Sequence, residues 1–321
     1  YLILISQHMD KEMVQINQRN SIPEKQNQPL QLECLAAQRS LYSKAKTIFI
    51  LEILLAVPIV VLLSLISAYF PSFLPWFALY GLIVTTIDYL ILENVQNNLK
   101  KKAAQIQELF DCRVLELDWP FWKIPHRPDP EDIVSEAANY KKKDSDFGSL
   151  YNWYPLAIEK LPLDKARIVC QRTNVWYDSS LRHRYTNIIF ILLVFFCILI
   201  LCIGLLQSLN LEKLILGVAI PLSPALYWGI REIRSQRDAA SNLDRLKDYA
   251  ETLIDEIKTD EVAPPIAAMK SRSFQDEIYE NRKNNPLILD AIYNVLREKH
   301  ELQMNKGNEE LVEELVKTKD I

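Results

Sequence analysis

Aromatic and basic side chains occur close together in the middle of the chain. Nucleotide bases stack on aromatic rings and arginine side chains pair with phosphates, so this combination suits a nucleotide ligand. Tryptophan and tyrosine are also ordinary residues of protein cores and membrane interfaces, and for each side chain that alternative stays open. The candidate ligand-binding residues are Trp119, Trp122, Lys123, Arg127, Trp153, Tyr154, Arg172, Trp176, Tyr177 and Arg182.

Two acidic residues, Glu52 and Asp88, lie inside otherwise apolar stretches. Ionisable side chains are costly in lipid and usually face a bundle interior or a water-filled cavity, and rings of acidic side chains can form a cation-selective pore. Pairing with a neighbouring lysine at the membrane interface is the alternative. Pro221 and Pro224 lie in another apolar stretch, where each removes a backbone hydrogen bond and favours a kink. The candidate pore-lining residues are therefore Glu52, Asp88, Pro221 and Pro224.

Motifs of common enzymes and metal sites are absent from the sequence. Four of the six glycines lie in apolar stretches, so no glycine-rich loop can hold a phosphate group. The four histidines are isolated, no metal-binding spacing occurs, and no nucleophile motif of the Gly-x-Ser-x-Gly type is present. We therefore expect no catalytic residues, no metal and no cofactor, and we predict that the protein is not an enzyme.

Four apolar stretches are close to the roughly 20 residues that cross a ~30 Å hydrocarbon core. They cover residues 47–70, 73–92, 188–209 and 214–230. Buried helices of soluble proteins usually keep a polar stripe, whereas residues 188–206 have no polar face at any helical period. Lipid and neighbouring membrane helices supply apolar surroundings on every side. The sequence therefore predicts four transmembrane helices in two hairpins.

The distribution of basic residues predicts the orientation of these helices. Of the 37 lysine and arginine residues, only Lys213 lies in a turn between two paired spans. Short segments rich in lysine and arginine stay on the cytoplasmic side. We therefore expect both termini and the middle region to be cytoplasmic, no disulfides among the five cysteines, and no cleaved signal peptide.

The predicted fold class is mainly α and integral to the membrane, with a cytoplasmic α+β and helical region. Residues 112–118 alternate apolar and polar side chains, which is typical of a half-buried strand. The predicted organisation is a poorly ordered segment (1–29), a cytoplasmic amphipathic helix (30–46), a first transmembrane hairpin (47–92), a cytoplasmic α+β module (93–185), a second transmembrane hairpin (186–230), a cytoplasmic helical region (231–302) and a charged tail (303–321).

A row of apolar residues in the C-terminal region has the spacing of a coiled coil. Leu243, Leu246, Ala250, Leu253 and Ile257 follow one another at alternating distances of three and four residues. Only two heptads are present. A coiled coil between subunits and a helix that packs on its own domain are both compatible with this row.

Several motifs over residues 30–302 resemble the SMODS-associating four-transmembrane effector family. They are Ala36-Ala-Gln-Arg-Ser-Leu-Tyr42, Leu109-Phe-Asp-Cys-Arg-Val-Leu-Glu-Leu-Asp-Trp-Pro120, Trp153-Tyr-Pro155 with Leu161-Pro162, Cys170-Gln-Arg-Thr-Asn-Val-Trp-Tyr-Asp-Ser179, and Phe274-Gln-Asp-Glu-Ile-Tyr279 with Pro286-Leu287 and Tyr293.

The resemblance implies an effector of CBASS, a bacterial antiphage system in which a nucleotidyltransferase makes a cyclic oligonucleotide after infection. A multi-pass protein of the bacterial inner membrane would bind this messenger and, as a homo-oligomer, form a pore or disrupt the membrane, leading to abortive infection. The expected partners are membrane lipids, the messenger and further copies of the chain, with no nucleic-acid polymer. The alternative is a membrane-anchored protein-interaction scaffold without pore activity.

Overall fold

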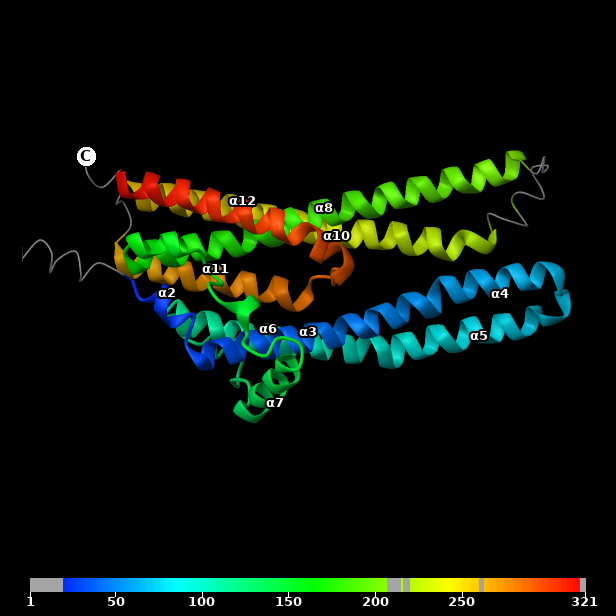
Figure 1. Cartoon of the computed structure of the whole chain (residues 1–321), viewed down its shortest axis with the longest axis horizontal. Helices are drawn as coiled ribbons and strands as arrows, with labels where there is room; N and C mark the ends of the chain where they lie inside the picture. The colour runs from blue at the N-terminus through cyan, green and yellow to red at the C-terminus, as the bar shows by residue number, and fades with distance from the viewer. Residues whose placement is uncertain (1–19, 207–214, 216–219, 260–262, 318–321) are drawn as a thin grey trace, which may run out of the picture.

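The computed structural model describes residues 20–206, 215, 220–259 and 263–317 as an elongated helical molecule (Figure 1). That part of the chain contains no β-strand. The helices are α2 (Ile22–Lys25), α3 (Pro29–Ala56), α4 (Pro58–Tyr69), α5 (Leu74–Ile87), α6 (Glu93–Val114), α7 (Pro130–Lys141), α8 (Leu163–Leu206), α10 (Ile220–Lys258), α11 (Pro264–Asn284) and α12 (Asp290–Lys317). Short 3-10 helices, η1 (Pro71–Phe73), η3 (Gly148–Leu150) and η4 (Leu156–Lys160), and a π-helical turn, η2 (Asp88–Leu92), lie between them.

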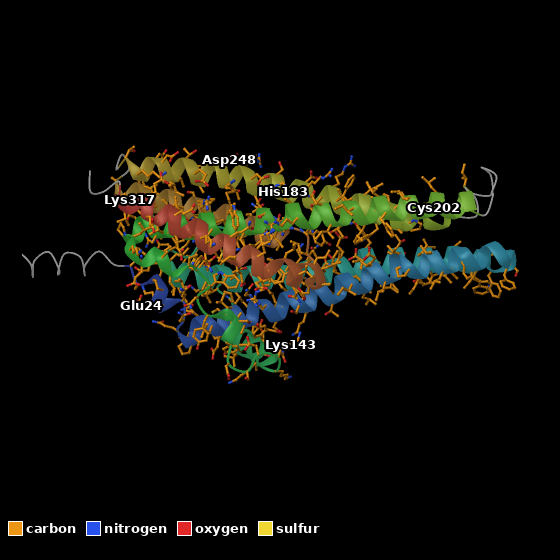
Figure 2. All side chains as sticks on the ribbon, turned by 45° about the horizontal axis from the view of Figure 1, so that its top comes forward. Glu24, Lys143, His183, Cys202, Asp248 and Lys317 are labelled. Atoms are coloured by element: carbon orange, nitrogen blue, oxygen red, sulfur yellow. The ribbon has the colours of Figure 1, made fainter. Side chains whose placement is uncertain are left out.

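Two arms project from one end of the molecule. The first arm comprises residues 47–92 of α3, α4, α5 and η2, and the second arm comprises residues 188–206 of α8 and 220–230 of α10 (Figure 1). Large apolar side chains on both arms face outward; Leu82 is 66% exposed and Ile191 is 65% exposed. Figure 2 shows Cys202 near the end of an arm, whereas Glu24 and Lys317 lie at the opposite end of the molecule. We call the remaining described residues the body.

Two helical segments in the described residues are long and apolar enough to cross a membrane. They are Pro29–Leu63, with 35 residues, and Pro75–Val114, with 40 residues. Almost none of the most apolar part of either segment is buried inside the molecule, so lipid is the medium that suits it. The turn predicted between the third and fourth spans, residues 210–213, lies outside the described residues.

The strand predicted at residues 112–118 is wrong. Helix α6 continues to Val114, and the chain then turns because Glu116 adopts a left-handed conformation with φ 53°. The amide of Leu117 donates to the carbonyl oxygen of Cys112 at 2.9 Å, the hydrogen bond of a Schellman helix end. A few alternating residues cannot distinguish a strand from a helix end whose side chains are buried on one side. The α+β module is therefore an all-helical region.

Salt bridges and hydrogen bonds stabilise this helix end. Lys25 pairs with the Glu116 carboxylate at 2.5 Å, and Arg167 donates to the carbonyl oxygens of Leu115 and Glu116 at 2.5 and 2.6 Å. The pKa of Glu116 is lowered, chiefly by its hydrogen bond with Lys25. These contacts compensate for the cost of a left-handed residue that is not glycine.

The body is one helical core made from both halves of the chain. α3 packs on α6 and α7, while α8 packs on α10, α11 and α12. The main cluster of buried apolar side chains includes residues from α3, α6, α8 and α10, among them Leu35, Phe110, Val169 and Leu253. All five cysteines are free.

The heptad-like row of α10 packs within the chain. Leu243 and Ala250 form a buried cluster with Val175 of α8 and with Phe274 and Ile278 of α11. Farther along α10, Leu253 and Ile257 enter the main core. The apolar side chains of the row are thus buried without a second subunit. Of the two alternatives compatible with the sequence, the structure has the helix that packs on its own domain.

Both ends of the described chain are integrated into the body. Residues 1–19 of the predicted poorly ordered segment lie outside the described residues, but Asn20 donates to the carbonyl oxygens of Ile158 and Leu161 at 2.7 and 2.8 Å. At the other end, α12 continues through most of the predicted charged tail, and Val312 and Leu315 enter the core. Because these segments are mostly polar, their composition did not indicate the few side chains that anchor them to the body.

Candidate functional site

A cavity of about 730 Å³ lies in the body, within the size range of small-molecule sites. Its walls come from α3, α8, α11 and α12 and from the segments 148–153 and 285–288, with single residues from α6, α7 and α10. Six aromatic and five basic side chains line it: Tyr42, Tyr140, Tyr151, Trp153, Tyr177 and Tyr293, with Arg39, Lys46, Arg182, Arg282 and Arg297. The cavity therefore combines surfaces for stacking with positive charge, the two features that a nucleotide requires.

Most of the cavity's positive charges already have partners. Three carboxylates, Asp178, Asp290 and Glu301, also line the cavity. Arg182 pairs with Asp178 at 3.1 Å, Arg297 pairs with Glu301 at 2.6 Å, and Lys46 pairs with Asp290.

Arg39 is the exception among the basic side chains of the cavity. Arg39 forms no ion pair with a described residue. Its guanidinium carbon lies 5.7 Å from the centroid of the Trp153 ring. A guanidinium over an aromatic face is held in place yet keeps its hydrogen-bond donors for a ligand. Arg39 is therefore the positive charge most available to an incoming phosphate.

A buried polar network holds Arg282 in the cavity wall. Its guanidinium pairs with Asp111 of α6, a side chain with no exposed surface. Asp111 also accepts hydrogen bonds from the Tyr154 hydroxyl at 2.7 Å and from Gln275 Nε2 at 2.8 Å. Burial and the Asp111 carboxylate raise the pKa of Tyr154, so its hydroxyl stays protonated and donates. On the other side, Asn174 of the cavity wall donates to the Tyr154 oxygen at 3.0 Å.

The structure places three of the ten predicted ligand residues in the cavity, namely Trp153, Tyr177 and Arg182. Tyr154 and Trp119 are buried in the main core instead. The Tyr154 hydroxyl contributes to the network behind Arg282, and Trp119 Nε1 donates to the carbonyl oxygen of Ile124 at 2.9 Å.

The remaining five predicted ligand residues point elsewhere. Trp122 is fully exposed at 101%, and Arg127 lies over the ring of Phe121. The other three have partners outside the cavity: Lys123 pairs with Glu277 at 3.7 Å, Arg172 pairs with Glu251 at 2.7 Å, and Trp176 makes an edge contact with His300.

The sequence analysis missed Tyr140 and Tyr151 of the middle region and all the basic cavity residues that lie outside it. Arg39, Tyr42 and Lys46 come from α3, and Arg282 and Arg297 come from α11 and α12. The spacing of Arg39, Tyr42 and Lys46, at three and four residues, places them on one face of a helix. This helix face carries two positive charges beside an aromatic ring, and that pattern could have indicated a ligand-binding surface.

The two acidic candidates for pore lining lie on the first arm. The Glu52 carboxylate of α3 accepts a hydrogen bond from Gln96 of α6 at 3.4 Å. Asp88 begins the π-helical turn η2, and its Oδ1 is buried without a hydrogen-bond partner. Neither carboxylate forms an ion pair with a described residue. The interfacial pairing with lysine that the sequence left open is therefore not seen in this part of the chain.

The two proline candidates lie in α10. Pro224 is inside the helix, where its ring removes a backbone donor. Pro221 lies near the start of the same helix, and its side chain is outside the described parts of the structure.

The apolar arms and the polar cavity define the class of this chain, a helical membrane protein with a ligand-sized cavity in its body. The sequence family described as "SMODS-associating 4TM effector domain" matches residues 20–311, and the chain belongs to that family. The protein of Bacillus cereus (strain VD146) described as "Probable CBASS effector molecule IK1_05631" is 26% identical over 294 residues, covering 89% of this chain and 96% of that protein. No solved structure matches. The resemblance seen in the sequence motifs is thus confirmed.

Proposed function

We propose that this chain is a membrane effector of CBASS antiphage defence. Its cavity binds a cyclic oligonucleotide, and the bound chain, as an oligomer, forms a pore in or disrupts the bacterial inner membrane. The observation that carries this proposal is the cavity itself, where an unpaired guanidinium, several aromatic rings and four further basic side chains surround about 730 Å³. Family membership supports the antiphage role.

Helix α3 supports a direct connection between ligand and membrane. Arg39, Tyr42 and Lys46 line the cavity, and the same helix continues without a break through Glu52 to Ala56. From Tyr42 to Glu52 the distance is roughly 15 Å along the helix axis. A ligand that shifts the cavity wall therefore also shifts the start of the first arm.

Pore formation requires several copies of the chain. Four spans enclose little or no aqueous lumen, so a pore of this kind forms in a closed symmetric ring. Glu52 and Asp88 would then supply a ring of acidic side chains and favour cations. Both termini and the body lie in the cytoplasm in this proposal, where the messenger is made.

The scaffold alternative loses one of its two supports from the sequence. The heptad-like row of α10 and the acidic tail both favoured it. Because Leu243, Ala250, Leu253 and Ile257 are buried against other helices of the same chain, that row is not open to a partner.

Leakage from proteoliposomes tests the proposal. The purified chain is reconstituted with a trapped dye, and cyclic di-AMP, cyclic di-GMP, cyclic GMP-AMP and cyclic tri-AMP are added one at a time. We expect one of these nucleotides to release the dye, and Arg39→Gln to weaken the response. Arg245→Gln is the matched control and should behave like the wild type, since among the described residues this exposed arginine is hydrogen-bonded only to Asn242. Silence of the folded, correctly oriented protein across the panel would contradict the proposal.

A further inference from the structure

An ion pair joins two sides of the cavity at the base of the first arm. Lys46 lies on α3 immediately before the apolar segment, and Asp290 is the first residue of α12. Both side chains line the cavity, and they form an ion pair with each other. The Lys46 ammonium also lies 5.6 Å from the centroid of the Tyr293 ring. This contact therefore ties the first arm to the helix that closes the opposite wall.

The Lys46–Asp290 pair is easier to break than the ion pairs of Arg182 and Arg282. Arg282 is held by the buried Asp111, and Arg182 donates to Gln236 at 2.6 Å and to the carbonyl oxygen of Pro286 at 2.9 Å. By contrast, Asp290 is 51% exposed at its side chain, and water screens its attraction for Lys46. A ligand can thus recruit Lys46 at a smaller cost than Arg182 or Arg282.

Asp290 keeps a favourable environment when Lys46 leaves it. It stands at the N-terminus of α12, a helix of 28 residues, where the helix dipole favours a negative charge. Lys46 in turn keeps its contact with the Tyr293 ring. The separated state therefore leaves neither charge buried without a partner.

Arg39 and Lys46 are spaced to hold two phosphates of one ligand. They are seven residues apart on α3, which places them on the same helix face about two turns and roughly 10 Å apart. Arg39 has no ion pair with a described residue to break and would bind the first phosphate. A second phosphate would then compete with Asp290 for Lys46.

We propose that the Lys46–Asp290 ion pair is a latch that an anionic ligand with two phosphodiesters opens. This inference rests on the proposed function and adds how binding reaches the membrane. The linker before Asp290 contributes Leu287, which packs on Ala45 and Phe49 of α3. When a phosphate takes Lys46, α3 loses its ionic contact with α12 next to this cluster, and the first arm is free to move relative to the second.

The two halves of the latch have opposite expected effects on the response. Proteoliposome leakage is measured against the concentration of the nucleotide from the panel that opens the wild type. Asp290→Asn frees Lys46, so basal leakage rises and the half-maximal concentration falls about threefold, the scale of an exposed ion pair. Lys46→Gln also opens the latch and raises basal leakage, but it removes the contact with the second phosphate, so the half-maximal concentration rises about tenfold.

A matched pair outside the cavity provides the control. Lys102 and Asp132 form an exposed ion pair at 3.0 Å, and Lys102→Gln and Asp132→Asn make the same charge changes. We expect both control variants to behave like the wild type. Thermal unfolding of all four variants checks that each one folds.

Two results would overturn the latch. If Lys46→Gln and Asp290→Asn shift the half-maximal concentration in the same direction, the ion pair only stabilises the folded body. If Asp290→Asn matches Asp132→Asn in both basal and triggered leakage, the pair does not restrain the arm. In both cases the wild type still responds to nucleotide, so the proposed function survives. A wild type that is silent to the whole panel removes both proposals.

Discussion

The body and the arms place charged and apolar side chains in opposite ways. In the body, the carboxylates of Glu108 and Asp111 have no exposed surface, and each is paired with an arginine and hydrogen-bonded to Gln275. On the arms, large apolar side chains such as Leu82 and Ile191 are mostly exposed. The body therefore depends on specific polar partners, whereas the arms depend on an apolar medium around them.

This difference predicts where a single substitution destabilises the protein most. Asp111→Asn preserves the size of the side chain but leaves Arg282, which is 12% exposed at its side chain, without its counter-charge. Removing one partner of a buried ion pair costs about 3–5 kcal/mol. We expect a loss of this size in the free energy of unfolding, measured by denaturant titration in detergent.

Asp132→Asn is the control for this loss. Its pair with Lys102 is exposed on both sides, so the substitution should cost less than about 1 kcal/mol. Equal losses in the two variants would mean that the polar network behind the cavity does not stabilise the body.

Two tryptophans, Trp153 and Trp122, separate ligand binding in the cavity from binding on the outer surface. Trp153 lies in the cavity wall under Arg39, whereas Trp122 is fully exposed. Stacking of a base on an aromatic ring is worth about 1–3 kcal/mol. Trp153→Leu should therefore weaken nucleotide affinity about tenfold, and Trp122→Leu should leave it within about twofold, as checked by isothermal titration calorimetry. The reverse order would place the ligand on the outer surface of the body.

The acidic residues of the first arm allow a test that leaves the body intact. Glu52→Gln combined with Asp88→Asn removes two charges from the arm and none from the cavity. We expect the preference for cations over anions in planar-bilayer recordings to fall, with nucleotide affinity unchanged. An unchanged ion preference would exclude these two carboxylates from the conducting path.

The smallest expected effect is a pH dependence of stability at His300. Its side chain is buried. Nδ1 donates to the carbonyl oxygen of Leu296 at 3.0 Å, and Nε2 lies 3.1 Å from the Ser180 hydroxyl, which donates to it when the ring is neutral. Burial lowers the pKa of His300 below its ordinary value of 6.5. The unfolded chain therefore takes up a proton first as the pH falls through 6.5, and the folded state loses stability below that value.

His300→Gln isolates this contribution from other titrating groups. The variant should show a smaller fall in unfolding temperature between pH 7 and pH 5.5 than the wild type. The two curves should differ by no more than a few degrees, since one group contributes about 1 kcal/mol or less. Parallel curves would show that His300 does not contribute to the pH dependence.

The difference between body and arms also explains which structural features could be predicted from the sequence. Apolar stretches of span length are a local property, and the structure has the predicted helices at residues 47–92 and on both sides of the second turn. The helix end at Glu116 is local too, but its left-handed residue is a glutamate, which carries no signal for a turn as glycine would. The predicted strand was wrong for that reason.

The cavity is harder to predict because it is assembled from distant segments. Arg39, Trp153, Arg182 and Arg297 come from four different parts of the chain. They come together because α3 packs on α6, α6 packs on α11, and α8 packs on α11 and α12. Composition drew attention to the middle region, where Trp122 and Arg172 share the same chemistry but face other surfaces. Residue type alone did not distinguish a side chain in the cavity wall from one that serves the core or the surface.

The central claim is that the nucleotide binds in the cavity of the body. Hydrogen exchange followed by mass spectrometry, with the chain in lipid vesicles and with the nucleotide that triggers leakage, tests it most directly. We expect new protection in two non-helical parts of the cavity wall, residues 151–153 and the linker 285–289, and none in residues 119–127. Protection of residues 119–127 with no change at the cavity would contradict the account.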